Sequence, residues 1–162
     1  YFFLHLLHRW EKYFFPVKYI KNSIINKDEI RLITFLRDPV ERLSSHYAFW
    51  KSGDFSNHYL WRTMIKEDWS FARFALSKEM KNYYSQVLSQ IPISYFDFVG
   101  IHENVGKDWE RLCDYLKMKR QALPLTNRSN SDYILSKIDA ALLKEIKEFH
   151  SEDYLIYNYF AE

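Results

Sequence analysis

Hydrophobic positions along the chain fall into segments with helical spacing and segments of strand length. Aromatic and aliphatic residues recur at helical spacing over residues 2–14, and Pro16 follows them, so we predict a first helix over residues 1–14. Residues 30–36 are instead apolar at most positions and rich in β-branched side chains. Such a run is typical of a strand buried on both faces, as in a parallel sheet. Residues 17–20 could form a further short strand.

A helix is predicted directly after this strand. The carboxylate of Asp38 can accept a backbone N–H that has no helical partner, and Pro39 suits the first turn because proline has no N–H. An apolar stripe follows, made of Val40, Leu43, Tyr47 and Trp50. It predicts a helix over residues 39–52, which the polar segment around Gly53 should end.

The rest of the chain combines further helices with one more strand. We predict amphipathic helices over 58–79 and 81–91, a strand over 95–101, a helix over 105–118, a basic loop through residue 131, a helix carrying apolar residues from Ile134 to Phe149, and a short aromatic segment over 153–160. Strands separated by helical segments imply a parallel sheet covered by helices. The predicted fold class is therefore α/β, a helix-rich three-layer domain with a short parallel sheet.

Composition limits what this domain can be. A chain of 162 residues suits a single domain, and its one cysteine cannot form an intramolecular disulfide. Cys113 lies on the apolar stripe of the helix over 105–118, so we interpret it as a small core residue. No group of Cys and His has the spacing of a metal site, and no apolar run is long enough for a transmembrane helix.

Charge and glycine content narrow the function further. With 23 basic against 21 acidic residues, the chain is too evenly charged to attract a polyanion as a whole, so any anion site must be local. Aromatic residues do alternate with Lys and Arg in places, but we interpret them as core residues rather than a nucleic-acid surface. The 3 glycines stand apart, so these residues contain no glycine-rich phosphate loop.

The predicted strand-to-helix junction carries the candidate chemistry. Ligands of open α/β sheets bind beyond the carboxyl ends of the strands, where Arg37 lies. At about 100° per residue, Ser45 lies on the side of the helix opposite its apolar stripe. The two side chains could together hold a phosphate by charge, paired hydrogen bonds and a hydroxyl. The alternative is that Arg37 pairs with Asp38 or Glu41 and that Ser45 only packs.

The string Arg37-Asp38-Pro39, with Ser45 eight residues after the arginine, resembles the 3′-phosphate-binding motif of sulfotransferases that use 3′-phosphoadenosine 5′-phosphosulfate (PAPS). The longer string RDPVERLSSHY looks especially similar to carbohydrate-type and bacterial members. The strand FDFVGI, the loop with Asn127, Arg128 and Ser129, and the C-terminal aromatic segment resemble later parts of the same family. The resemblance covers roughly residues 30–160.

This resemblance implies a P-loop NTPase-like fold and transfer of a sulfuryl group from PAPS to a hydroxyl or amine of a carbohydrate or small-molecule acceptor. The nucleotide product would be adenosine 3′,5′-bisphosphate. Arg37 and Ser45 are implied to hold the 3′-phosphate. The loop of Asn127, Arg128 and Ser129 occupies the place where family members close over the nucleotide, although a solvated basic loop is the alternative there. No metal is required, because a lysine and backbone N–H groups take its place in the family.

One signature of the family is absent from these residues. Its Lys-x-Gly-Thr-Thr/Ser turn, which binds the 5′-phosphosulfate, precedes the first helix in the family. If residues 1–14 are that helix, we expect the turn immediately upstream of Tyr1. Residues 1–162 would then form one sulfotransferase-like domain without its N-terminal strand and 5′-phosphosulfate loop.

The catalytic base stays unassigned. In the family it is usually a His or Glu between the first helix and the arginine-bearing strand, and Glu29 is the candidate there. His5 and His8 are better explained as surface or partly buried residues of the predicted first helix. His46 adjoins Ser45, and a helix-stabilising or substrate-side role suits it better than that of a general base.

Other interpretations stay open at this point. A non-catalytic helical interaction domain could keep the fold without the 5′-phosphosulfate loop, and a nucleic-acid module is a third, less favoured hypothesis. We interpret His102 and Glu103, after the second strand, as a solvated turn and helix cap. The single cysteine and the many Lys, Asn and Ile residues favour a cytoplasmic bacterial protein, with the Golgi lumen as the alternative for a eukaryotic fragment.

Overall fold

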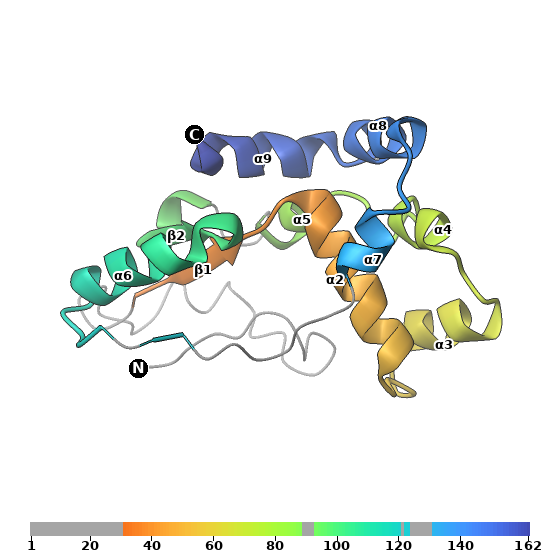
Figure 1. Ribbon diagram of the computed structural model, residues 1–162, viewed down its shortest axis with the longest axis horizontal. Helices are drawn as coiled ribbons and strands as arrows, with labels where there is room; N and C mark the ends of the chain where they lie inside the picture. Colours follow the sequence, from red (N-terminus) through yellow and green to blue (C-terminus); the bar gives the residue numbers. More distant parts are fainter. Residues whose placement is uncertain (1–30, 89–92, 121, 124–130) are drawn as a thin grey trace, which may run out of the picture.

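The computed structural model describes residues 31–88, 93–120, 122–123 and 131–162 (Figure 1). The predicted helix over 1–14 and the short strand over 17–20 lie outside these residues. Within them, no helix is long and apolar enough to cross a membrane. The described part of the chain is α/β and rich in helix, as the sequence predicts.

Two parallel strands form the sheet of the described region. β1 (Ile33–Leu36) pairs with β2 (Phe98–Ile101), and Phe35 lies opposite Gly100. A methyl group at residue 100 would overlap the Phe35 ring, so the strands can pack in this way only because residue 100 has no side chain. Burial is less complete than predicted for β1, since Leu36 is buried but the other three residues of the strand are only partly so.

Helix α2 (Pro39–Ser52) has the predicted bounds. Asp38 caps it, because Oδ1 of its carboxylate accepts the backbone N–H groups of Val40 at 2.9 Å and Glu41 at 3.1 Å. Along the predicted stripe, Val40, Leu43 and Trp50 are buried, and Tyr47 packs against the same core. The sequence pattern therefore predicted both the ends and the buried face of this helix.

The predicted helix over 58–79 is wrong as a single element. It is divided into α3 (Tyr59–Lys66) and α4 (Phe71–Ala75), with a turn between them in which Asp68 has a φ of 43°. Asp tolerates this left-handed conformation, and Ser70 then caps α4 by accepting the N–H of Arg73. The next helix, α5 (Tyr83–Leu88), follows Asn82, which has a φ of 47°.

The second strand and the helix after it are shorter than predicted. A 3₁₀ turn, η1 (Ile93–Tyr95), precedes β2, and a second one, η2 (His102–Asn104), connects β2 to α6 (Val105–Tyr115). The helix stops early because Lys117 adopts a φ of 53°. Cys113 is a buried free thiol on α6, as expected of a small core residue.

The C-terminal part contains three helices where the pattern predicted one helix and a short segment. They are α7 (Ser131–Leu135), α8 (Ala140–Phe149) and α9 (Ser151–Ala161). Asp139 starts α8 by accepting the N–H of Leu142 at 2.8 Å. Figure 1 shows α8 and α9 following one another along one side of the molecule, and α9 contacts α5, α2 and β2.

Two apolar clusters hold the described elements together. The larger one joins α2, α3, α4 and α8 and is centred on side chains such as Trp50, Phe74 and Ile146. The smaller one joins the strand ends to α5 and contains Leu36, Tyr84 and Ile101, with α9 side chains packed against it. The candidate site is built on this smaller cluster.

Candidate functional site

The carboxyl ends of the two strands lie side by side. Leu36 pairs with Ile101 at the last position of the ladder, so the residues after each leave the sheet at the same edge. There, Oε1 of Glu103 accepts the backbone N–H of Asp38 at 2.9 Å. The exposed turn after β2, which the sequence predicted, therefore also fixes the start of α2, and this second role of Glu103 was not predicted.

Tyr84 fixes the backbone of Arg37. Its hydroxyl accepts the Arg37 N–H at 2.9 Å and donates to the Arg37 carbonyl at 3.0 Å. Burial raises the pKa of Tyr84 to about 12, so the phenol keeps the proton that it donates at neutral pH. Both backbone polar groups of Arg37 are thus held by one side chain.

Two tyrosines of α9 complete the junction. The hydroxyl of Tyr154 donates to Oδ1 of Asp38 at 3.4 Å, and the hydroxyl of Tyr157 donates to Oε2 of Glu103 at 3.2 Å. Burial raises the pKa of both phenols, that of Tyr157 to about 12. The aromatic segment over residues 153–160 was visible in the sequence, but it did not indicate the partners of these tyrosines.

The guanidinium of Arg37 forms an ion pair with Glu41. Oε2 of Glu41 accepts from Nε at 3.3 Å and from Nη2 at 3.2 Å. This is one of the pairings that the sequence left open as the alternative to a phosphate contact. The Arg37 side chain is 21% exposed and that of Glu41 38%, so both reach solvent at the edge of the sheet.

Ser45 lies about two turns along α2 from the cap, partly buried and with contacts of its own. Its neighbour Ser44 is fully buried and donates to the carbonyl of Glu41 at 2.9 Å. The structure thus places Arg37 before α2 and Ser45 on it. The other three predicted site residues, Asn127, Arg128 and Ser129, lie outside the described residues.

Of the residues considered as a catalytic base in the sequence analysis, the structure describes His46. Glu29, His5 and His8 lie outside the described residues. The ring of His46 meets Trp50 and Phe74 edge-on, with centroids 4.5 and 5.5 Å away, which is a packing role in the larger cluster.

His102 follows β2 at the same edge of the sheet as Arg37. Partial burial, and then the positive charge of Arg37, lower the pKa of His102, while Glu103 and Glu41 act in the opposite direction. An imidazole is therefore electrostatically coupled to the candidate arginine, although the sequence interpretation gave it no part in the site.

A buried ion pair connects α2 to α9 close to the junction. Nη2 of Arg42 lies 3.5 Å from Oδ2 of Asp153 on α9, and the Arg42 guanidinium stacks over the rings of Tyr83 and Tyr84 at 4.7 and 4.9 Å. Asp153 also accepts the N–H of Ser85 at 3.0 Å. Because the two residues are 111 positions apart in the sequence, the pair could not be predicted from local patterns.

His150 extends this network toward α4. Its Nδ1 accepts the N–H of Asn82 at 3.1 Å, so Nε2 carries the proton and donates to the Ala75 carbonyl at 2.7 Å. The side chain is fully buried, and desolvation lowers its pKa. A neutral imidazole therefore links three chain segments.

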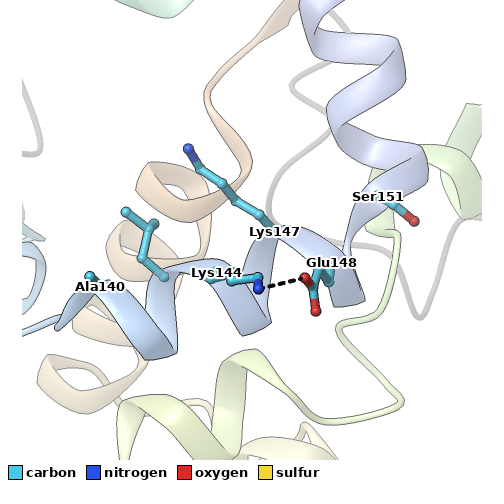
Figure 2. A pocket seen from close by; sticks show the side chains of 6 residues that line it. Ala140, Lys144, Lys147, Glu148 and Ser151 are labelled. Carbon is cyan, nitrogen blue, oxygen red and sulfur yellow. Dashed lines mark ion pairs between the residues drawn. The ribbon is translucent and has the colours of Figure 1, made fainter.

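The two hollows described on the surface lie elsewhere. The larger, of about 470 Å³, lies along α8 and is shown in Figure 2, where Lys144 and Glu148 form an ion pair at 3.8 Å. The smaller, of about 320 Å³, lies between α2, α4, α7 and α8 and is lined by residues such as Tyr47, Phe71 and Ile138. Neither contains Arg37. In the described part of the chain, no group of three His, Cys, Asp or Glu residues is arranged to hold a metal ion.

A model of the sulfotransferase family matches residues 3–160. The chain belongs to the sulfotransferase family. This membership supports sulfotransferase activity in general, with a sulfate donor and an acceptor. No curated protein and no solved structure matches the sequence significantly. The match includes β1, α2 and nearly all of α9, so the junction around Arg37 lies within the matched residues of this sulfotransferase-family protein.

Proposed function

We propose that this sulfotransferase-family protein transfers a sulfuryl group from PAPS to a hydroxyl or amine of a carbohydrate or small-molecule acceptor. Arg37 and Ser45 would hold the 3′-phosphate of the donor, and Asn127, Arg128 and Ser129 would contribute further contacts to the nucleotide. In the reaction the acceptor oxygen or nitrogen forms a bond to sulfur, and the bond from sulfur to the bridging phosphate oxygen breaks. The products are the sulfated acceptor and adenosine 3′,5′-bisphosphate, and the acceptor's proton passes to a base.

One observation carries the proposal. Arg37 lies directly beyond the carboxyl end of β1 with its backbone held by Tyr84, while its guanidinium remains partly exposed. A fixed backbone and an accessible cation at this edge suit the binding of an anion in an α/β fold. Arginine is also the side chain best matched to two phosphate oxygens at once.

A direct test compares two nucleotides that differ only at the 3′ position. We expect adenosine 3′,5′-bisphosphate to bind more tightly than AMP in calorimetry with the full natural protein. Arg37→Ala removes a charge-assisted contact, so the affinity for the bisphosphate should fall by about ten- to a hundredfold. The matched control is Arg120→Ala, since Arg120 is an exposed arginine beyond the C-terminal end of α6, paired with Glu110 and Asp114.

Equal affinity for the two nucleotides in the wild-type protein would contradict the assignment of the 3′-phosphate site. Catalysis is tested separately, by sulfate transfer from radiolabelled PAPS to a panel of carbohydrate and small-molecule acceptors. Nucleotide preference without transfer to any acceptor would favour the non-catalytic alternative.

A further inference from the structure

Arg37, just before α2, and Arg42, in its first turn, are paired with carboxylates that differ in exposure to solvent. Arg42 is paired with Asp153 in the interior, where the side chains are 7% and 0% exposed. Arg37 is paired with Glu41, where the side chains are 21% and 38% exposed. A carboxylate in solvent can leave its partner at little cost, because water replaces the lost contact. The pair of Arg37 and Glu41 is therefore the exchangeable one.

The atoms that Glu41 occupies are those that a phosphate would use. Its Oε2 accepts from both Nε and Nη2, which form one two-pronged edge of the guanidinium. A phosphate bound to that edge would take the place of the carboxylate. If the carboxylate stayed beside it, two anions would share one cation and repel each other.

The backbone geometry allows such an exchange without a change in fold. Tyr84 holds both the N–H and the carbonyl of Arg37, and Asp38 caps α2 through backbone N–H groups, so the cap does not use the side chain of Glu41. The side chains of Arg37 and Glu41 can thus change partners while the junction keeps its shape. The capping contacts and the ion pair use different acceptors.

We infer that Glu41 is a competing counter-ion that occupies Arg37 in the nucleotide-free protein and that the 3′-phosphate displaces. Glu41 thereby sets the affinity of the site, and it lowers that affinity for both the donor and the bisphosphate product. This inference rests on the proposed function, because it requires the 3′-phosphate to bind at Arg37. It adds a residue that tunes binding in the direction opposite to Arg37 itself.

The test is the variant Glu41→Gln, which keeps the size of the side chain and removes its charge. The affinity for adenosine 3′,5′-bisphosphate should rise by about three- to tenfold, while the affinity for AMP should stay unchanged. The gain should shrink as salt concentration rises, since salt screens exposed charges. Glu41→Ala should give the same direction of change, which excludes an effect of the new amide.

The matched control is Glu148→Gln. Glu148 is likewise an exposed carboxylate paired with a cation four residues away, on α8, in the hollow shown in Figure 2. This variant should bind the bisphosphate with wild-type affinity. Thermal unfolding of all three variants verifies that they fold.

The outcomes separate this inference from the proposed function. If the wild-type protein prefers the bisphosphate over AMP but Glu41→Gln and Glu41→Ala bind it no more tightly, Glu41 does not compete for Arg37 and the inference is wrong; weaker binding would show that Glu41 orients Arg37. If the wild-type protein shows no preference, the 3′-phosphate assignment fails and the inference fails with it.

Discussion

Arg42 and Asp153 are 111 residues apart in the sequence and form a buried ion pair between α2 and α9, with 3.5 Å between Nη2 and Oδ2. The Nε and Nη1 atoms of Arg42 have no hydrogen-bond partner within the described part of the chain and lie in the stack with Tyr83 and Tyr84. The pair therefore fixes α9 against the helix that carries the site, and each charge depends on the other for compensation.

Removal of one of the two charges should lower the free energy of unfolding by more than the loss of the contacts between them, because the other charge stays buried. We expect Arg42→Met to lower the free energy of unfolding by about 3–5 kcal/mol, because it leaves the Asp153 carboxylate buried without a cation. Burial already raises the pKa of Asp153 even with Arg42 beside it. Urea unfolding at neutral pH measures the loss.

The double variant Arg42→Met with Asp153→Asn separates the charge effect from packing. Its loss should be clearly smaller than the sum of the two single losses, since neither buried charge is then left alone. The comparison variant is Lys144→Met, which breaks the exposed pair with Glu148 and should change stability little. Additive losses from the two buried substitutions would show that Arg42 stabilises the helix by packing alone.

Acid should destabilise the fold through His150. Burial lowers the pKa of this histidine below its ordinary value of 6.5, so the unfolded chain binds a proton that the folded protein resists. The stability that the neutral imidazole contributes is complete above pH 6.5 and is lost as the pH falls through the lowered pKa. The slope can reach about 1.4 kcal/mol per pH unit. Urea unfolding between pH 7.5 and 5.5 measures it.

The variant His150→Gln tests whether His150 causes this slope. At pH 7.5 it should be less stable by about 1–3 kcal/mol, since the contacts with Asn82 and Ala75 are impaired. Its stability should nevertheless change less than that of the wild type as the pH falls to 5.5. A variant with the full wild-type slope would assign the acid sensitivity to other groups.

The close contact between Gly100 and Phe35 gives a test of the sheet. Gly100→Ala places a methyl group about 2.6 Å from Cδ1 of the Phe35 ring, and we expect a loss of about 1–3 kcal/mol from this overpacking. Chemical denaturation measures the change. The added variant Phe35→Leu should recover part of the loss by making room for the methyl group.

Gly106→Ala serves as the matched control for the sheet. Gly106 lies in α6, and a methyl group there would meet nothing within 4 Å. Since alanine favours the helix and restricts the unfolded chain, this variant should be more stable by about 0.4–1 kcal/mol. Equal effects at the two glycines would contradict the packing of β1 against β2.

The junction between β1 and α2 could be predicted because its signals are local. Asp38 caps the helix from the position just before it, Pro39 fits the first turn, and the apolar stripe of α2 runs from Val40 to Trp50. The helices over 58–79 and 105–118 were predicted too long because their ends have no such local signal. A periodic pattern continues across a turn, and single residues such as Asp68 and Lys117 end a helix by adopting a left-handed conformation that few sequence signals announce.

The sequence predicted residues of the candidate site but not the contacts that hold the site in place. Arg37 and Ser45 share one local segment with a recognisable spacing, so the sequence could name them. The contacts that hold Arg37 and Asp38 in place come from Tyr84, Glu103 and the tyrosines of α9, which lie between 47 and 116 residues from their partners in the chain. No periodicity or spacing encodes such a pairing.

The α/β class, the capped helix after β1 and the family to which the chain belongs can be recognised from the amino-acid sequence, since each depends on a short-range pattern or motif. The partner of each charged side chain becomes known only when the helices are packed together. Arg37 and Arg42 differ by five positions on the same segment, yet one pairs with an exposed carboxylate and the other with a buried one. The two pairs differ because α9 packs across α2 and buries Arg42 but leaves Arg37 partly exposed. Burial in turn affects the strength of an ion pair and whether a ligand can replace one of its members.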